Sequence, residues 1–275
     1  IQRSRGLGDV YKRQNEDEPD ALLLRSKVLS ENNFNDQLLC IGRAGAGVNN
    51  IPIDIASKRG VVVFNTPGAN ANAVKELVLC GLLLSSRGII QGNSFAKSLA
   101  IDEVSEFNSR IENEKKNFKG SELYGKTLGV VGLGAIGSMV AQSADALGMK
   151  LIGYDPYISI DAAWRLPKEV QKANSIEELV GCSDFISIHV PLVDSTKDLI
   201  SKDLLKHFKQ GSKLINLSRG GIVNNNDVIE ALQSKILSSF VTDFPSMELS
   251  QRANDFGDVI LLPHIGASTT EAEVN

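Results

Sequence analysis

The chain has few cysteines, little excess of either charge and no long apolar run. Its three cysteines, Cys40, Cys80 and Cys182, are far apart and set among apolar neighbours. Their odd number and their spacing favour buried thiols over disulfides or metal ligands. With 29 basic and 33 acidic residues the formal net charge is −4, which argues against a nucleic-acid partner, because such a partner needs a broad basic face.

Membrane and secretory signals are also missing from the sequence. No apolar run approaches the roughly 18 residues that cross a bilayer, and no charged and then apolar leader with a cleavage site opens the sequence. We therefore expect a cytoplasmic protein. The first residues, 1–14, have neither helical nor strand periodicity, and we expect a foreign segment or a disordered tail that takes no part in the core.

What is present is an ordinary globular composition, with 42% hydrophobic and 23% charged residues in 275. This length predicts about two domains. Beyond Ala21, short apolar runs alternate with helical stretches, and this alternation predicts an α/β fold with a doubly wound parallel sheet. The expected strands lie within 22–29, 38–42, 61–65, 127–131, 184–190, 213–218, 238–243 and 258–263, and the expected helices include 71–85, 201–209 and 225–234.

The runs also predict how the domains are organised. A small domain is expected over 15–90 and a larger one over 121–268. The region between them, 91–120, carries apolar residues at helical spacing, which predicts an amphipathic connector helix that packs on the core. These residues are Ile101, Val104, Phe107 and Ile111. The last residues, 269–275, are expected to begin a helix that returns to the small domain.

A glycine loop follows the apolar run 127–131 and precedes a helical stretch. Gly132 permits a tight turn, Gly134 lets backbone amides approach a pyrophosphate, and Gly137 lets the helix pack closely on the strand. Asp155 ends the next strand, 18 residues after Gly137, where a carboxylate can accept hydrogen bonds from ribose hydroxyls. This βαβ pattern predicts a dinucleotide site that favours NAD over NADP, because the carboxylate repels a 2′-phosphate. The alternative is a glycine-rich turn in an unrelated α/β protein.

Three side chains that could act in the oxidation of a hydroxy acid lie after other expected strands. His264 is the candidate base, since an imidazole can take a hydroxyl proton near neutral pH. Glu248 can stabilise the imidazolium, and Arg219 can bind the carboxylate or carbonyl of a 2-oxo acid. Each residue alone is more often structural or solvated. Of the other histidines, His207 is expected on the surface, and His189 fits either a cofactor site or a structural role.

Several motifs in order resemble the D-isomer-specific 2-hydroxyacid dehydrogenase family from about Asp20 to the C-terminus. They are RSKVL, GRAGAGVNNI, VFNTPGANANAVKELV, LYGKTLGVVGLGAIG, IHVPL, NLSRGGIV, VTDFPSME and LPHIGAS. The resemblance implies a Rossmann-type NAD domain with a smaller flavodoxin-like substrate domain, and commonly a homodimer. It gives Arg219 a substrate-orienting role, Glu248 a histidine-supporting role and His264 the acid–base role.

The resemblance also implies which residues bind the cofactor and the substrate. Asp243 would hold the nicotinamide carboxamide, and amides near Ala46 and Gly47, with Asn70 nearby, would meet the substrate carboxylate. Further positions along the implied NAD cleft are Ala135, Ile136, Asp155, Pro191, Thr196 and Ser218.

Two arginines bear on the choice of substrate. Arg25 and Arg43 follow strands of the small domain, and paired guanidinium groups suit a phosphate. Family members that oxidise 3-phosphoglycerate have similar arginines near its phosphate, which implies that substrate. Surface ion pairs are the plainer alternative for each arginine. The rival functions are a family dehydrogenase for hydroxypyruvate, glyoxylate or lactate, and a non-enzymatic NAD-sensing binding module.

The chain departs from the family pattern in places. Leu249 follows Glu248 where the family usually has proline, and Phe244-Pro245 replaces a common Val-Phe pair. The five-residue step from Asp243 to Glu248 is kept, so both assignments stand. Family members usually begin with a further strand and helix, and some end with a regulatory domain. We therefore expect a fragment, in which feedback control cannot be read.

Overall fold

The computed structural model describes residues 19–25, 27–45, 47–66, 68–101 and 103–274. The expectation for residues 1–14 lies outside these residues. Contacts divide the described residues into two compact units, one formed by those up to Ala73 with those from Ala267 on, and the other by Val74–Gly266.

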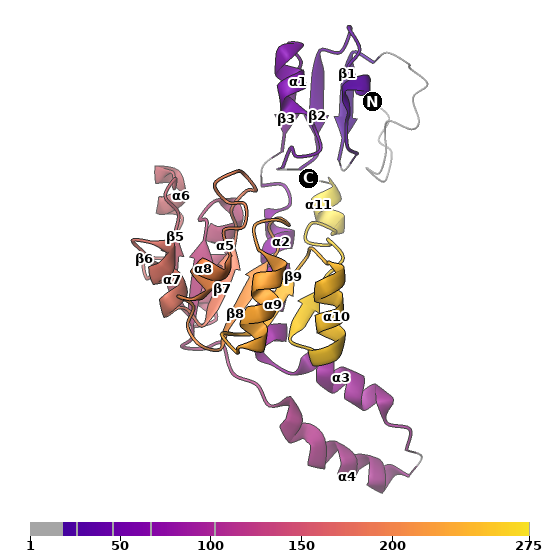
Figure 1. Ribbon diagram of the computed structural model, residues 1–275, viewed down its shortest axis with the longest axis vertical. Coiled ribbons are helices and arrows are strands. Elements are labelled where there is room, and N and C mark those ends of the chain that lie inside the picture. The colour runs from indigo at the N-terminus through magenta and orange to yellow at the C-terminus, as the bar shows by residue number, and fades with distance from the viewer. Residues whose placement is uncertain (1–18, 26, 46, 67, 102, 275) are drawn as a thin grey trace. The chain divides into compact units, whose positions relative to one another are not determined.

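The larger unit is built on a seven-stranded parallel sheet (Figure 1), in the order β10-β9-β8-β7-β4-β5-β6. Within this sheet the first strand in sequence is β4, an internal strand. The chain then moves outward through β5 and β6 and crosses back to β7 on the other side of β4. This is the doubly wound arrangement that the sequence predicted, and the prediction of the fold class is confirmed. The strands are β4 (Thr127–Val131), β5 (Lys150–Tyr154), β6 (Gln171–Lys172), β7 (Phe185–Ile188), β8 (Ser212–Asn216), β9 (Leu237–Thr242) and β10 (Val259–Leu261).

Helices cover both faces of this sheet, so its central strands are mostly apolar, and all four residues of β7 are buried. One apolar cluster joins a face of the sheet to α2 (Ala71–Ser86) and α5 (Ala135–Ala146). The other cluster joins the sheet to α7 (Ile176–Cys182), α8 (Lys202–Leu205), α9 (Asn225–Gln233) and α10 (Met247–Phe256). A shorter helix, α6 (Ile160–Trp164), follows β5.

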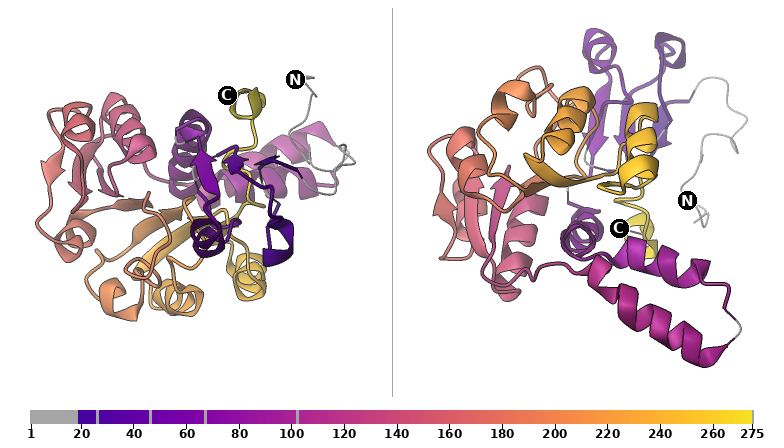
Figure 2. Two further views of the ribbon diagram at one scale, coloured as in Figure 1. Left: turned by 90° about the horizontal axis from the view of Figure 1, so that it is seen from above. Right: turned by 60° about the horizontal axis from the view of Figure 1, so that its bottom comes forward.

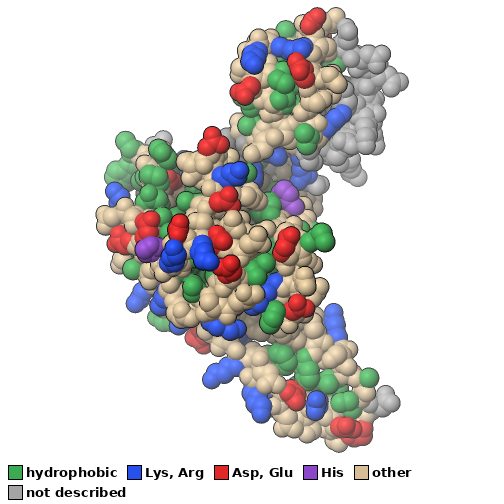
Figure 3. Space-filling model, in the orientation of Figure 1, with side chains coloured by type: hydrophobic (Ala, Val, Ile, Leu, Met, Phe, Trp, Pro, Cys, Tyr) green, Lys and Arg blue, Asp and Glu red, His purple; other side chains and the backbone are tan. Residues whose placement is uncertain are grey.

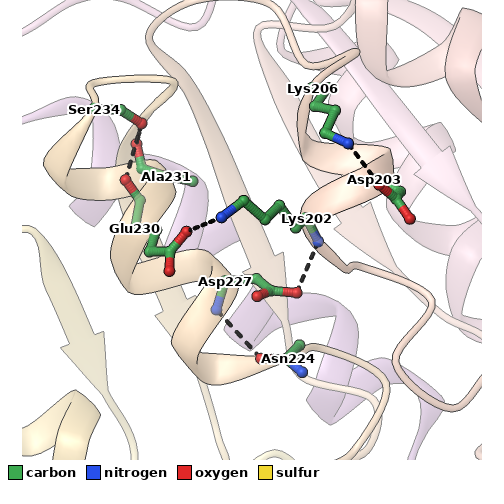
Figure 4. Close-up of polar contacts among 8 residues, drawn as sticks. All are labelled: Lys202, Asp203, Lys206, Asn224, Asp227, Glu230, Ala231 and Ser234. Atoms are coloured by element: carbon green, nitrogen blue, oxygen red, sulfur yellow. Dashed lines mark hydrogen bonds and ion pairs between the residues drawn. The ribbon is translucent and has the colours of Figure 1, made fainter.

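A polar network holds α8 against α9 on their outer side (Figure 4). The backbone N–H of Lys202 donates to Asp227 at 2.7 Å, and the Lys202 Nζ donates to Glu230 at 2.7 Å. The helix predicted over 201–209 is only four residues long. It ends early because the amides of His207 and Phe208 bond three residues back, which tightens the chain into turns.

The region between the predicted domains forms a helical arm rather than a single packed connector. It comprises α3 (Ile89–Ser98), α4 (Val104–Glu114) and the 3₁₀ helix η3 (Lys115–Phe118), with α3 and α4 side by side (Figures 1 and 2). The rings of Phe95 and Phe118 pack at 5.2 Å within the arm. The prediction of core packing was wrong, since no residue of α4 is buried and Val104 is 71% exposed. The apolar stripe of α4 thus has no core beneath it within the larger unit.

The smaller unit has a three-stranded parallel sheet in the order β1-β2-β3. One face packs on a core that includes Leu22, Ile41 and Ala56. The other face exposes Leu23 and Phe64, at 68% and 59%. The elements are β1 (Ala21–Leu24), η2 (Glu31–Asn33), β2 (Cys40–Arg43), α1 (Ile53–Lys58), β3 (Val62–Asn65) and α11 (Thr270–Val274).

The cysteines carry free thiols, but the prediction that they are buried was wrong for two of them. Cys80 and Cys182 are exposed, and Cys40 is partly buried. On α2 the buried residues include Val74, Val78 and Leu82, and Cys80, midway between Val78 and Leu82, lies away from the face that these three share. Within the described residues, we find no helix with both the length and the apolar character that a bilayer-spanning segment requires.

Candidate active site

The predicted site residues of the larger unit lie after the carboxyl ends of its strands. Because all seven strands are parallel, these ends lie along one edge of the sheet, the usual position of ligands in doubly wound proteins. From one side to the other the edge carries His264 after β10, Asp243 after β9, Ser218 and Arg219 after β8, Pro191 and Thr196 after β7, the glycine loop after β4 and Asp155 after β5. The glycine loop adjoins the point between β4 and β7 where the strand order reverses.

The glycine loop has the geometry that a pyrophosphate requires. Gly132 has φ 89°, and a Cβ on Gly137 would lie 2.0 Å from the carbonyl oxygen of Gly132, so the fold itself demands these two glycines. Gly134 precedes α5, and a Cβ there would meet no atom within 4 Å. The fold leaves open space at Gly134, next to the first N–H groups of α5, which have no acceptor inside the helix. Ala135 and Ile136 supply these groups, and an anion fits here.

Asp155 fastens the glycine loop from the neighbouring strand. One carboxylate oxygen accepts the N–H of Leu133 at 2.8 Å, and the other accepts the N–H of Tyr157 at 2.9 Å. An ionised carboxylate has about four acceptor positions, so these bonds leave room for ribose hydroxyls. The predicted ribose ligand is therefore also part of the support for the phosphate loop.

Two hydroxyls after β7 and β8 bind main-chain carbonyls. Ser218 donates to the oxygen of Val190 at 2.9 Å, which ties the segment after β8 to the segment after β7. Thr196 donates to the oxygen of Pro191 at 2.6 Å and accepts the N–H of Val193 at 2.9 Å. Thr196 and Ser218 thus shape the loops at the centre of this edge.

Arg219 is half-buried at the end of β8. Its Nη1 donates to the carbonyl oxygen of Ser218 at 2.6 Å, and burial lowers the pKa of its guanidinium. Asn216, which is 2% exposed, donates to the oxygen of Arg219 at 2.9 Å and accepts the N–H of Ser218 at 3.2 Å. Sequence reasoning missed Asn216; its signal was a polar residue at the end of a strand that is buried on both faces.

His264 is exposed in the loop after β10 and has a left-handed backbone, with φ 57°. Its ring meets the ring of Phe244 edge to face, with centroids 5.1 Å apart. Asp243 is 1% exposed, and its two carboxylate oxygens accept the N–H groups of Ile265 at 2.8 Å and Gly266 at 2.7 Å. Nothing in the sequence pattern predicted that Asp243 binds the histidine loop.

Glu248 lies exposed in the first turn of α10. Its own backbone N–H and the hydroxyl of Ser246 lower the pKa of its carboxyl. Within the described part of the chain, no hydrogen bond joins Glu248 to His264, so its role as a support for the histidine stays a prediction.

The other two histidines differ in their surroundings. His207 is exposed, as predicted. His189 is partly exposed as a residue, but its ring is shielded. Nε2 lies 2.9 Å from the Ser187 hydroxyl, and Nδ1 is buried with no hydrogen-bond partner among the residues that the structure describes. Desolvation lowers the pKa of His189 to about 4, so its imidazole is neutral near pH 7.

The smaller unit brings the two predicted phosphate ligands together. Arg25 follows β1, and Arg43 ends β2 in register with Leu24. The Arg43 Nε donates to the carbonyl oxygen of Arg25 at 3.1 Å, and Arg25 Nη2 donates to the oxygen of Ala267 at 3.2 Å. Gly47 and Asn70 are partly buried in loops of this unit, and Ala46 lies outside the described residues.

Comparisons with known proteins agree with these arrangements. The sequence model of the D-isomer specific 2-hydroxyacid dehydrogenase NAD-binding domain matches residues 82–266. A D-3-phosphoglycerate dehydrogenase of Synechocystis is 38% identical over 263 residues, which cover 94% of this chain and 45% of that protein. The chain thus spans less than half the length of this relative.

Solved structures with the same fold include two with different substrates in their names. An NAD⁺-bound 3-phosphoglycerate dehydrogenase of Entamoeba histolytica is 29% identical, with a TM-score of 0.73 over 93% of this chain and 74% of the other. A D-lactate dehydrogenase of Escherichia coli is 25% identical, with a TM-score of 0.75 over 92% and 78%. The family match covers most of the larger unit, and its NAD-binding domain agrees with the glycine loop and the strand order. The chain therefore belongs to the D-isomer specific 2-hydroxyacid dehydrogenase family.

Proposed function

We propose that this protein is an NAD-dependent dehydrogenase that oxidises D-3-phosphoglycerate to 3-phosphohydroxypyruvate, the first step of serine biosynthesis. The observation that carries the proposal is the edge of the parallel sheet, where an open glycine loop follows β4, a half-buried arginine follows β8 and an exposed histidine follows β10. The choice of substrate is supported by the name of the Synechocystis relative and by the paired arginines Arg25 and Arg43.

The cofactor would be held by residues along this edge. The amides of Ala135 and Ile136, with the space beside Gly134, suit the pyrophosphate, and Asp155 suits the ribose of NAD rather than NADP. Asp243 would accept from the nicotinamide carboxamide. The loops shaped by Pro191, Thr196 and Ser218 would border the same cofactor.

In the reaction, His264 accepts the proton of the substrate hydroxyl at a ring nitrogen. When bound, NAD supplies the carbon that receives the hydride. Arg219 orients the substrate carboxylate with two donors and stabilises its charge. Glu248 stabilises the imidazolium by its negative charge. In the reverse direction His264 returns the proton to the alkoxide oxygen.

Substrate recognition is proposed for the smaller unit. Arg25 and Arg43 bind the phosphate, since two planar guanidinium groups offer several charge-assisted hydrogen bonds. Backbone amides near Ala46 and Gly47, with Asn70, bind the carboxylate. The fold alone does not separate this substrate from D-lactate, because proteins named for both have similar TM-scores.

Steady-state kinetics test the proposal. Reduction of 3-phosphohydroxypyruvate, hydroxypyruvate, glyoxylate and pyruvate is compared, each with NADH and with NADPH. We expect the highest kcat/KM for 3-phosphohydroxypyruvate with NADH. A preference for an unphosphorylated oxo acid would reject the phosphate role of the arginines. NADH binding without turnover of any oxo acid would favour the NAD-sensing module, which the presence of Arg219, Glu248 and His264 argues against.

We further propose a homodimer that uses the helical arm. The arm exposes Ile89, Ile90 and Val104, at 49%, 40% and 71%, and apolar side chains gather on it in Figure 3. A second copy can cover such a surface. Sedimentation of wild type and of Val104→Asp tests the proposed dimer. We expect wild type to be a dimer and the charged variant to dimerise more weakly, and a monomeric wild type would reject the proposal.

We also propose a cytoplasmic location and functional domain limits of 15–90 and 121–268.

A further inference from the structure

The loop that carries His264 is held by one buried carboxylate. The last ladder bond of β10 runs from the N–H of Leu262 to the oxygen of Thr242 at 2.9 Å. Beyond it, the two oxygens of Asp243 accept the N–H groups of Ile265 and Gly266. Thus the two residues that follow His264 are both bound to Asp243, which itself directly follows β9.

This arrangement has no independent explanation in the local sequence. His264 is not a glycine, yet its φ of 57° lies in the left-handed region, which costs energy for most side chains and persists only where neighbours enforce it. A Cβ on Gly266 would lie 3.0 Å from Asp243 Oδ2, so the loop approaches the carboxylate closely. The ring contact with Phe244 fixes the imidazole from a second side.

We propose that Asp243 is a positioning residue that sets the backbone turn and the direction of the His264 imidazole. Its two bonds use about half of the acceptor positions of a carboxylate, so the same group can also receive the nicotinamide carboxamide. The catalytic consequence rests on the proposed function, in which His264 is the base. The positioning itself does not.

The experiment uses three variants of the full chain. Asp243→Asn places an amide donor against a backbone N–H and removes the charge. Gly266→Ala keeps the carboxylate but crowds it, and it remains informative if Asp243→Asn does not fold. Asp184→Asn is the matched control, because Asp184 accepts the N–H of Thr127 at 2.9 Å at the amino end of the sheet, away from the site.

Amide hydrogen exchange and the NMR signals of the histidine rings are the primary measurements. In Asp243→Asn and Gly266→Ala we expect exchange at Ile265 and Gly266 to be roughly tenfold faster, as for the loss of a hydrogen bond to a charged acceptor, and the His264 ring signals to shift. Asp184→Asn should change neither. Two results in these two variants would overturn the proposal. One is exchange at the wild-type rate at both amides, and the other is faster exchange without a shift of the His264 ring signals.

Kinetics then separate positioning from cofactor binding. Gly266→Ala retains the carboxylate for nicotinamide, so we expect kcat to fall roughly tenfold while KM for NADH stays within about twofold. A rise in KM alone would contradict the positioning role. If the protein turns over no oxo acid at all, the exchange and NMR results still decide the proposal, and only the proposed function fails.

Discussion

At the scale of single residues, the site combines an exposed imidazole with buried groups that fix its surroundings. His264 is open to solvent, whereas Asp243 and Asn216 are 1% and 2% exposed. The two buried side chains bind backbone groups of the loops that carry His264 and Arg219. The proposed chemistry would therefore depend also on residues that need not touch the substrate.

His264→Gln should lower kcat by roughly a hundredfold or more, because general acid–base catalysis contributes about that much. Binding of NADH should stay within about twofold of wild type, since the base acts on the hydroxyl rather than on the nucleotide. Stopped-flow turnover and nucleotide fluorescence measure the two effects. His207→Gln, which removes an exposed histidine, is the control. Undiminished turnover in His264→Gln would remove this residue from the mechanism.

His189 predicts a pH dependence of stability. Desolvation lowers its pKa from 6.5 to about 4 in the folded state, so between these values the unfolded chain binds a proton that the folded chain does not. The contribution of the neutral ring is complete above about pH 6.5 and is lost as the pH falls toward 4, with an upper limit of about 3 kcal/mol. Urea unfolding of wild type and His189→Gln at several pH values tests this. Equal pH slopes for the two proteins would show that His189 does not contribute.

At the scale of elements, the βα unit was predictable because its signals are local. An apolar run, three glycines and a terminal acid specify β4, the loop, α5 and β5, and the structure has each where the pattern put it. The arm was not predictable in the same way. The stripe at Val104, Phe107 and Ile111 indicates an amphipathic helix, but periodicity does not say what covers the stripe. The contacts of Asp243 with the loop 265–266 span more than twenty residues and leave no local pattern.

Two glycines of the loop are expected to have different roles, Gly134 in the binding of NADH and Gly137 in the stability of the fold. Gly134→Ala should change the free energy of unfolding by about 1 kcal/mol or less, because its Cβ meets no atom within 4 Å, yet weaken NADH roughly tenfold or more by blocking the phosphate. Gly137→Ala should lower the free energy of unfolding by about 1–3 kcal/mol, because its Cβ would lie 2.0 Å from the Gly132 carbonyl oxygen. Chemical denaturation and NADH titration check both variants. Unchanged NADH affinity in Gly134→Ala would place the pyrophosphate elsewhere.

At the scale of the whole molecule, the evidence for the cofactor and the evidence for the substrate come from different units. The family match, residues 82–266, lies within the larger unit, whereas Arg25 and Arg43 lie in the smaller one. The doubly wound fold followed from the alternation of apolar runs and helices. The proposed selectivity was not fixed by that alternation, because it would depend on two guanidinium groups whose contacts, such as that of Arg43 with the oxygen of Arg25, are set by the fold of the smaller unit.

The central claim is that a dehydrogenase of this family uses this arginine pair to select a phosphorylated acid. The most direct measurement is the ratio of kcat/KM for 3-phosphohydroxypyruvate over hydroxypyruvate with NADH, in wild type, Arg25→Gln and Arg59→Gln. Arg59→Gln is the control, because it removes one positive charge from the same unit at a different place. Arg59 forms an ion pair with Glu31 and donates to the carbonyl oxygen of Phe34. We predict a preference of roughly tenfold or more in wild type and in Arg59→Gln, and its loss in Arg25→Gln. A wild-type ratio near one, or an unchanged ratio in Arg25→Gln, would contradict the account.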